Sequence, residues 1–282
     1  MKSVGGGPGI ELLLLLAAAL CFCFVAARRV SAPLTFEPVA READVLRVVT
    51  WNLGTGVDAG TQGLRREDMK RVVAVLMALE PDLVFLQELS SKGQLDRLRE
   101  RLGPDWQASM SDSGHGRPMA VLACGGSLSE LPTPEFIRAH AVEYRGSAGE
   151  LITCVVVHAD AFSAQARNQT LGELSSYLDS RVVGGRTLIA GDMNLDLSID
   201  QRGDLFSDDE YLDLETYNYF ARGRMDVGLG AGSTAKPDRR LDYIFIGAGE
   251  FDVLMAGPWL GQRAAEMDHH PLVADLRATG TE

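Results

Sequence analysis

The sequence RLDYIF at residues 240–245 places one carboxylate, Asp242, inside a run of large apolar side chains. Short apolar runs of this kind are typical of strands buried in a layered protein. A carboxylate in such a strand would itself be largely buried, and burying an unpaired charge is costly. Asp242 therefore needs a partner, and a histidine is the natural one.

Other apolar runs begin or end at an acid, an amide or a histidine. The residues concerned are Asn52, Glu88, His158, Asp192, Asn194, Asp268 and His269. Carboxylate and amide oxygens suit a hard metal ion such as Mg²⁺, and a histidine with a pKa near neutrality can move a proton. The sequence therefore indicates a hydrolase acting on a phosphate ester, with Asp242 orienting His269.

Some of these residues also have a purely structural explanation. A glutamate after a strand, such as Glu88, is commonly a solvated loop residue, and Asn52 is of a type that forms turns. Asp192 and Asn194 lie at a tight turn, where an Asx turn is the alternative to a catalytic role.

The pattern from residue 45 onward predicts a layered α/β domain. Strands are expected at residues 46–51, 83–86, 120–124, 151–158, 187–190, 241–246 and 272–275, and helices at 65–79, 94–102 and 164–178. Several connections are too short for parallel crossovers, so the sheet is expected to be mixed. Residues 103–118, 125–134 and 228–238 are rich in Gly, Pro or Ser and are predicted loops.

The N-terminus is predicted to be a targeting segment. Residues 12–27 are sixteen apolar residues without a charge, followed by Arg28 and Arg29. A membrane span needs about 20 residues, whereas the apolar core of a signal peptide has about 7–15. Residues 1–32 are therefore either a signal peptide or a membrane anchor, residues 33–43 a linker, and residues 44–278 the folded body. The protein is expected to be membrane-anchored, or secreted or periplasmic.

The charge balance argues against general binding of nucleic acid. The 282-residue chain has a formal net charge of −12 and only four lysines. Proteins that grip nucleic acid nonspecifically neutralise its phosphates with Lys and Arg. A lipid or small phosphate ester is therefore the favoured substrate.

Taken together, the motifs resemble the endonuclease/exonuclease/phosphatase superfamily over about residues 45–277. The matching stretches are VVTWNL with Asn52, LVFLQE with Glu88, VVVHAD with His158, GDMN with Asp192 and Asn194, RRLDYIF with Asp242, and MDHHPLVADL with Asp268 and His269. Arg167 begins a stretch similar to the arginine-to-glutamine segment that follows the family's histidine strand.

The resemblance implies a four-layer α/β sandwich, with two mixed β-sheets packed face to face and helices outside, as the catalytic domain 44–278. It also implies one Mg²⁺, sometimes replaceable by Mn²⁺, held by Glu88 with Asn52 and Asp268 nearby.

The resemblance also implies the catalytic roles. His269, oriented by Asp242, would be the general base or a donor to the transition state, and Asp192 would position or deprotonate the attacking water. Asn194 and His158 would hold oxygens of the scissile phosphate, and Arg167 is a further expected substrate-binding residue.

Three functions remain open at this point. The favoured one is an exported or tethered, monomeric Mg²⁺-dependent phosphoesterase. The second is a nuclease, which would require seven arginines to line one groove: Arg117, Arg145, Arg167, Arg222, Arg224, Arg239 and Arg240. The third is a catalytically silent tethered binding module. The acidic, aromatic segment 196–240 is expected to be a solvated loop and helix, or else a lid that selects the substrate.

Overall fold

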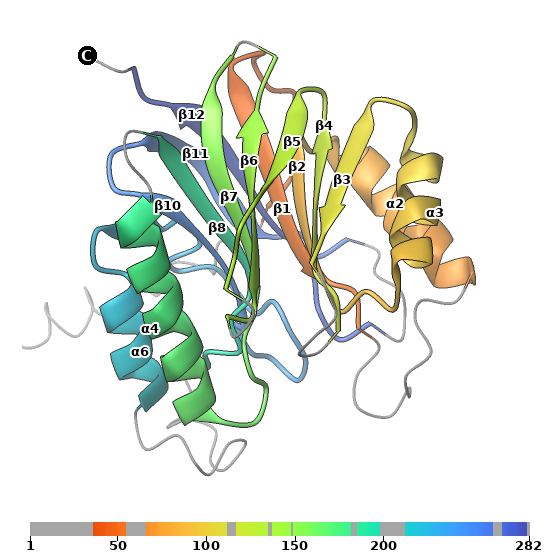
Figure 1. The fold of residues 1–282 in the computed structure, drawn as a ribbon. Coiled ribbons are helices and arrows are strands. Elements are labelled where there is room, and N and C mark those ends of the chain that lie inside the picture. Colours follow the sequence, from red (N-terminus) through yellow and green to blue (C-terminus); the bar gives the residue numbers. More distant parts are fainter. Residues whose placement is uncertain are drawn as a thin grey trace, which may run out of the picture. The chain divides into compact units, whose positions relative to one another are not determined.

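The fold is built from two mixed six-stranded sheets, as the computed structural model shows (Figure 1). The first sheet has the strand order β11-β12-β1-β2-β4-β3, and the second has the order β5-β6-β7-β8-β10-β9. The first contains β1 (Val45–Asn52), β2 (Leu83–Gln87), β3 (Trp106–Met110), β4 (Ala120–Cys124), β11 (Phe251–Pro258) and β12 (Leu272–Ala278). The second contains β5 (Ser127–Leu131), β6 (Ala139–Arg145), β7 (Leu151–His158), β8 (Arg186–Asp192), β9 (Arg224–Asp226) and β10 (Asp242–Gly247).

The structure describes residues 36–54, 66–111, 117–134, 137–147, 149–181, 185–197, 212–261 and 267–280. They all belong to one unit, Leu34–Glu282. The predicted targeting segment, residues 1–32, lies outside the described residues. Within them, no helix is long and apolar enough to cross a membrane.

Alternating side chains along the strands build separate cores. In β1, Val48 belongs to the core between the two sheets, whereas Val49 faces the helices of the first sheet. In β10, Ile244 belongs to the core between the sheets and Phe245 to the core beneath the helices of the second sheet. Successive strand side chains point to opposite faces, so a strand covered on both faces reads as a continuous apolar run.

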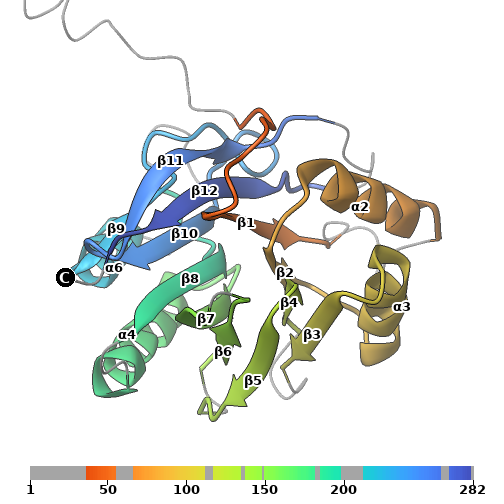
Figure 2. The same ribbon diagram turned by 90° about the horizontal axis from the view of Figure 1, so that it is seen from above.

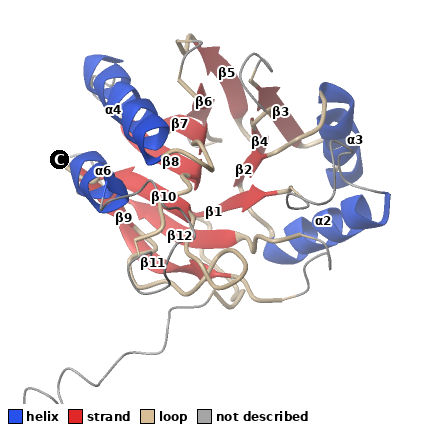
Figure 3. Ribbon diagram, turned by 90° about the horizontal axis from the view of Figure 1, so that it is seen from below, coloured by secondary structure: helices blue, strands red, loops and turns tan. Residues whose placement is uncertain are grey.

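Helices cover the outer face of each sheet (Figures 2 and 3). Helices α2 (Arg66–Leu79) and α3 (Lys92–Leu102) pack on the first sheet, and α4 (Ala164–Arg181) and α6 (Leu212–Phe220) on the second. The order helix, sheet, sheet, helix confirms the predicted four-layer α/β sandwich.

Two of the predicted loops contain strands. Strand β3 lies within 103–118 and strand β5 within 125–134. Both occupy edges of their sheets, and no residue of β5 is buried. An edge strand with exposed side chains lacks the continuous apolar run that identified the central strands, so the prediction was wrong there. In the segment 196–240, α6 confirms the expected helix, while residues 198–211 lie outside the described part.

Strand pairing brings polar strand ends together. Strands β1 and β2 run parallel, as do β7 and β8, and the parallel register pairs His158 with Asp192. Strand β10 runs antiparallel to β8 and begins with Asp242 opposite Asp192. The ends of these five strands therefore meet at one edge of the two sheets.

Candidate active site

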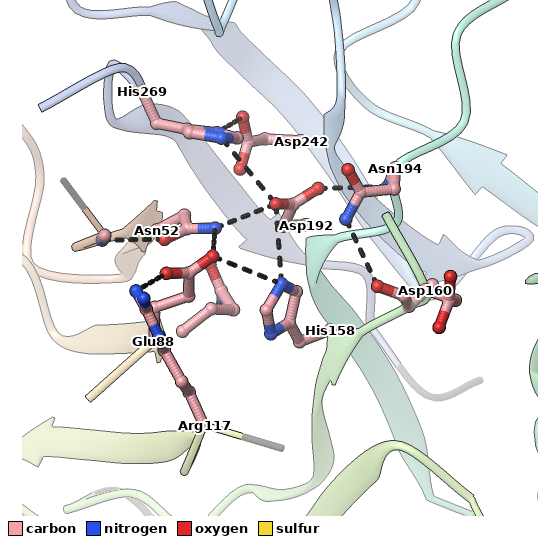
Figure 4. Close-up of polar contacts among 12 residues, drawn as sticks. Asn52, Glu88, Arg117, His158, Asp160, Asp192, Asn194, Asp242 and His269 are labelled. Atoms are coloured by element: carbon pink, nitrogen blue, oxygen red, sulfur yellow. Dashed lines mark hydrogen bonds and ion pairs between the residues drawn. The ribbon is translucent and has the colours of Figure 1, made fainter. Parts of the chain in front are cut away.

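Asp192 is the central carboxylate of the polar cluster at this edge (Figure 4). Its side chain is 2% exposed. Oδ1 accepts a hydrogen bond from the backbone N–H of Asn194 at 3.0 Å, which is the Asx turn considered from the sequence. Oδ2 accepts one from Asn52 Nδ2 at 2.8 Å and lies 3.7 Å from His269 Nε2 and 3.8 Å from His158 Nε2. One oxygen thus forms the turn, and the other faces two imidazoles.

Gly191 allows β8 to pack closely against β7, which brings Asp192 to the site. A Cβ at Gly191 would lie 1.9 Å from the carbonyl oxygen of Val157 on the neighbouring strand. Any side chain would therefore separate β7 from β8, whose register brings His158 and Asp192 together.

His269 and Asp242 form the predicted pair. His269 Nδ1 lies 2.8 Å from Asp242 Oδ2, and both side chains are buried. Because the carboxylate accepts the proton on Nδ1, it fixes the tautomer and leaves Nε2 toward Asp192. Trp51 Nε1 donates to the backbone carbonyl of His269, and Thr234 Oγ1 accepts from the N–H of Asp242. Both members of the pair are therefore held by neighbouring elements.

The charges around His269 control its protonation. Burial by itself lowers the pKa of His269, but the carboxylates of Asp242 and Asp192 outweigh it and raise that pKa to about 10. Burial raises the pKa of Asp242, whereas the positive charge of His269 and its hydrogen bond to Asp242 lower it; the effect of burial is the larger one. A pKa of about 10 keeps the imidazole of His269 protonated near neutral pH, so the buried pair holds a proton that Nε2 can donate.

Glu88 and Asn52 come from the first sheet. Asn52 Nδ2 donates to Glu88 Oε1 at 3.3 Å, in addition to its bond with Asp192. Asn52 Oδ1 accepts the N–H of Gly54 at 2.8 Å. Glu88 has φ = 59°, in the left-handed region that a non-glycine residue rarely adopts. Such strained conformations cluster at functional sites, where the surrounding structure maintains them.

The surroundings of Glu88 fit a divalent cation. A Cβ at Gly54 would lie 2.2 Å from Glu88 Oε2, so the glycine keeps the space beside the carboxylate free. Arg117 forms an ion pair with Glu88, and His158 Nε2 lies 3.7 Å from Glu88 Oε1. A carboxylate with neighbouring amide and carboxylate oxygens is the donor set that Mg²⁺ prefers. Asp192, Asp242 and His269 also offer ligand atoms within 4.8 Å of one another, but His269 Nδ1 is engaged by Asp242.

The remaining predicted residues take different places. Asn194 is 5% exposed, has φ = 52° and donates through Nδ2 to the carbonyl of Ala159 at 3.2 Å. Asp268 is half-buried beside His269 and adds to the negative charge there. Among the described contacts, none joins the Asp268 side chain to Glu88 or Asn52.

Arg167 is not brought into the cluster. It is fully buried, and its Nε and Nη2 bind the two carboxylate oxygens of Asp213 at 2.7 and 3.0 Å. Its Nη1 donates to the backbone carbonyl of Asp160. These contacts are those of an internal ion pair, in contrast to the substrate-binding role expected from the sequence.

Arg117 was not predicted to lie at the candidate metal site. Its proximity to Glu88 follows from the antiparallel pairing of β2 with β4, in which Leu86 lies opposite Ala120. A residue just after β2 and one just before β4 are therefore neighbours. The only sequence signal was a basic residue directly before an apolar run, which is weak without the pairing.

A family model described as "Endonuclease/Exonuclease/phosphatase family" matches residues 49–261. The chain belongs to this family. Members are metal-dependent phosphoester hydrolases, and the chain is accordingly an enzyme of that class. No curated protein sequence matches it.

Solved structures share the fold. An endonuclease/exonuclease/phosphatase from Beutenbergia cavernae is 23% identical, with a TM-score of 0.63 over 84% of this chain and 72% of that chain. A mannosyl-6-phosphatase of Bacteroides thetaiotaomicron is 16% identical, with a TM-score of 0.61 over 82% and 99%. TDP2 of D. rerio, complexed with a single-strand DNA product, is 18% identical, with a TM-score of 0.61 over 82% and 98%.

Proposed function

We propose that the protein is a Mg²⁺-dependent phosphoesterase that acts on a lipid or small phosphate ester rather than on bulk nucleic acid. The observation that carries this proposal is the pairing of its arginines. Five of the seven that could have formed a nucleic-acid groove are paired with carboxylates outside the candidate metal site. The pairs are Arg145 with Glu143, Arg167 with Asp213, Arg224 with Asp179, Arg239 with Asp196, and Arg240 with Asp226.

The other two arginines add little to a groove. The guanidinium of Arg222 lies over the ring of Tyr219, 5.4 Å from its centroid, and Arg117 pairs with Glu88. Nucleic-acid binding depends on cations that replace the counterions of successive phosphates. Arginines that are each neutralised by a carboxylate supply little positive potential for binding phosphates. A net charge of −12 also repels the nucleic-acid backbone. A substrate that presents one phosphate group to one metal ion therefore fits these observations best.

The metal would be held by Glu88 with Asn52, and with Asp268 nearby. When bound, Mg²⁺ neutralises charge on the phosphate ester and stabilises the leaving oxygen. Asn194 and His158 would hold the other phosphate oxygens, because both lie next to Asp192 on the second sheet. The two sheets therefore contribute different halves of the site.

Asp192 and His269 would manage the proton of the attacking water. Asp192 Oδ2 and His269 Nε2 are 3.7 Å apart, so one water can hydrogen-bond to both. Because the pKa of His269 is raised to about 10, the imidazole would carry its proton near neutral pH, so Asp192 would accept the water proton. His269 would donate through Nε2 to the transition state, and Asp242 would stabilise the imidazolium. The relatives named above include a phosphatase and a protein complexed with a DNA product, so the fold is compatible with monoesters and diesters.

We also propose that the protein is exported or membrane-tethered. The support is the uncharged apolar stretch 12–27 with its flanking basic residues. Fractionation of cells expressing the chain tests this point. Recovery of the full-length protein in the cytoplasmic fraction alone would contradict it.

Hydrolysis of a substrate panel tests the proposed function. The panel contains sphingomyelin, phosphoinositides, a sugar monophosphate, an aryl phosphodiester, RNA, and single- and double-stranded DNA, each with Mg²⁺ and with EDTA. We expect Mg²⁺-dependent cleavage of a lipid or small ester, absent in Asp192→Ala. Preferential cleavage of DNA or RNA would support the nuclease instead, and no turnover on any substrate would count against the proposal.

A further inference from the structure

Four charged side chains form a buried chain behind the phosphate-binding half of the site. They are Arg167, Asp213, Asp196 and Arg239, which are 0%, 1%, 1% and 8% exposed. Charged groups of these types are almost never fully buried unless they are paired. Replacing a buried ion pair with apolar residues is often neutral or stabilising, so stability alone is a weak explanation for the group.

Arg167 and Asp213 connect α4 with α6. The guanidinium donates through Nε and Nη2 to both oxygens of Asp213, in the two-pronged geometry that Arg alone provides. Asp213 lies in the first turn of α6, and Arg167 in the first turn of α4. The ion pair therefore fixes the start of one helix against the start of the other.

Each member of the pair also holds one loop of the site. Arg167 Nη1 donates to the backbone carbonyl of Asp160, two residues after His158. Asp213 Oδ2 accepts the backbone N–H of Asp196, two residues after Asn194, at 3.2 Å. One ion pair thus fixes the backbone beyond both residues expected to hold phosphate oxygens, while its side chains touch neither of them.

The chain of contacts continues to the catalytic pair. Asp196 Oδ2 accepts a hydrogen bond from Arg239 Nε at 2.7 Å. Arg239 lies three residues before Asp242, and the carbonyl of Leu241 accepts the N–H of Met193 at 3.0 Å. The loop that carries Asn194 is therefore tied both to the helices and to the start of β10.

We infer that Arg167 and Asp213 are positioning residues that set the distance between His158 and Asn194 and so shape the phosphate-binding half of the site. This inference rests on the proposed function, because it names the parts that hold its substrate's phosphate. It predicts that the pair affects phosphate binding and turnover and leaves Mg²⁺ binding unaffected, since Glu88 and Asn52 belong to the other sheet.

A second ion pair provides a matched control. Arg47 and Asp275 are 2% and 3% exposed and are joined by two hydrogen bonds of 2.7 and 2.8 Å. Arg47 also donates to the backbone carbonyls of Leu79 and Val39. The pair matches Arg167–Asp213 in burial and geometry. It braces β1 and β12 near the start of β1, whereas the site lies at the end of that strand.

The experiment compares two double variants of the full-length chain, Arg167→Met/Asp213→Leu and Arg47→Met/Asp275→Leu. Each removes both charges, so neither leaves a buried charge unpaired. The measurements are the Kd of inorganic phosphate in the presence of Mg²⁺, the Kd of Mg²⁺, the melting temperature, and kcat and KM for bis(4-nitrophenyl) phosphate. Arg167→Lys is included because it keeps the charge and loses the two-pronged contact.

In the Arg167–Asp213 variant we expect phosphate binding to weaken at least tenfold and kcat to fall about 100-fold, as for a displacement of about 1 Å in a site. Mg²⁺ affinity should stay within about twofold, and Arg167→Lys should recover part of the turnover. The Arg47–Asp275 variant should change only the melting temperature.

Equal losses of phosphate affinity in the two double variants would overturn the inference, as would unchanged affinity in the Arg167–Asp213 variant. If the wild type binds phosphate but hydrolyses no ester, the proposed function fails. The phosphate affinities of the two double variants still decide whether Arg167 and Asp213 position the phosphate-binding residues. A wild-type protein that does not bind phosphate would overturn the inference as well.

Discussion

The chemistry of single residues here depends on where the fold buries them. Asp242 would be unfavourable in the core without a partner, and His269 supplies one at 2.8 Å. The same contact directs Nε2 of the imidazole toward Asp192. Burial and pairing therefore convert a common strand-end histidine into a group placed for proton transfer.

Removal of His269 tests this assignment. We expect His269→Ala to reduce kcat for bis(4-nitrophenyl) phosphate by about 10²–10⁴-fold, the usual contribution of a positioned acid–base group. Asp242→Asn should lower kcat in the same direction, because it removes the charge that stabilises the imidazolium. Circular dichroism establishes that the variants are folded. Near-normal turnover in folded His269→Ala would exclude the role.

Gly54 allows a test of the metal site that needs no substrate. Alanine at this position would place its Cβ 2.2 Å from Glu88 Oε2, so Gly54→Ala should weaken Mg²⁺ binding by about 10–100-fold, as changes next to metal ligands do. The control is Gly172→Ala in α4, where a Cβ meets no atom within 4 Å. Calorimetric titration with Mg²⁺ measures both variants, and equal affinities would place the metal elsewhere.

Among single residues, the sequence predicted those members of the candidate site that lie at strand ends or within recognisable motifs. The pair of Asp242 and His269 was predicted because Asp242 lies within an apolar run and His269 directly precedes one, whereas the contact of Asn52 with Asp192 was not predicted. Arg117 was not assigned to the metal site, because its position beside Glu88 depends on the pairing of β2 with β4. The ion pair of Arg167 with Asp213 was not predicted, because the sequence alone does not show that a residue forty-six positions away neutralises it.

At the scale of elements, most central strands were predicted and the edge strands were not. The exception is the central strand β6 (Ala139–Arg145), which was missed because His140 and Glu143 interrupt its apolar run. Strands β4 and β7 begin and end at the predicted residues, because both are apolar runs covered on two faces. Strands β3 and β5 lie at sheet edges and contain polar residues among few apolar ones, so their sequences resemble loops. Strand order could not be derived from the chain alone, since it depends on contacts between distant segments.

The close contact of β7 with β8 leads to a stability prediction. Gly191→Ala would place a Cβ 1.9 Å from the backbone oxygen of Val157, which cannot move without breaking the parallel pairing. We expect a loss of about 3 kcal/mol in the free energy of unfolding, at the upper end for a single substitution. Urea denaturation measures it. A change below about 0.5 kcal/mol, the range of surface substitutions, would show that the strands have room.

At the scale of the whole molecule, charge separates the two remaining substrate classes. The net charge is −12, and the arginines near the second sheet are neutralised by carboxylates. We expect KM for a small phosphodiester to change less than about threefold between 50 and 200 mM salt. A protein that contacts 6–10 nucleic-acid phosphates would lose about 10³–10⁵-fold in affinity over that range. A steep salt dependence of single-stranded DNA binding would contradict the small-ester assignment.

The proposed function requires that the two sheets combine one metal site with one proton-transfer group to hydrolyse a phosphate ester. Its most direct test is the turnover of bis(4-nitrophenyl) phosphate by the wild type and Asp192→Ala, first with EDTA and then after Mg²⁺ is added back. We predict that only the wild type regains turnover with Mg²⁺. Turnover that survives EDTA would contradict the metal requirement, and equal turnover by Asp192→Ala would contradict the role of Asp192.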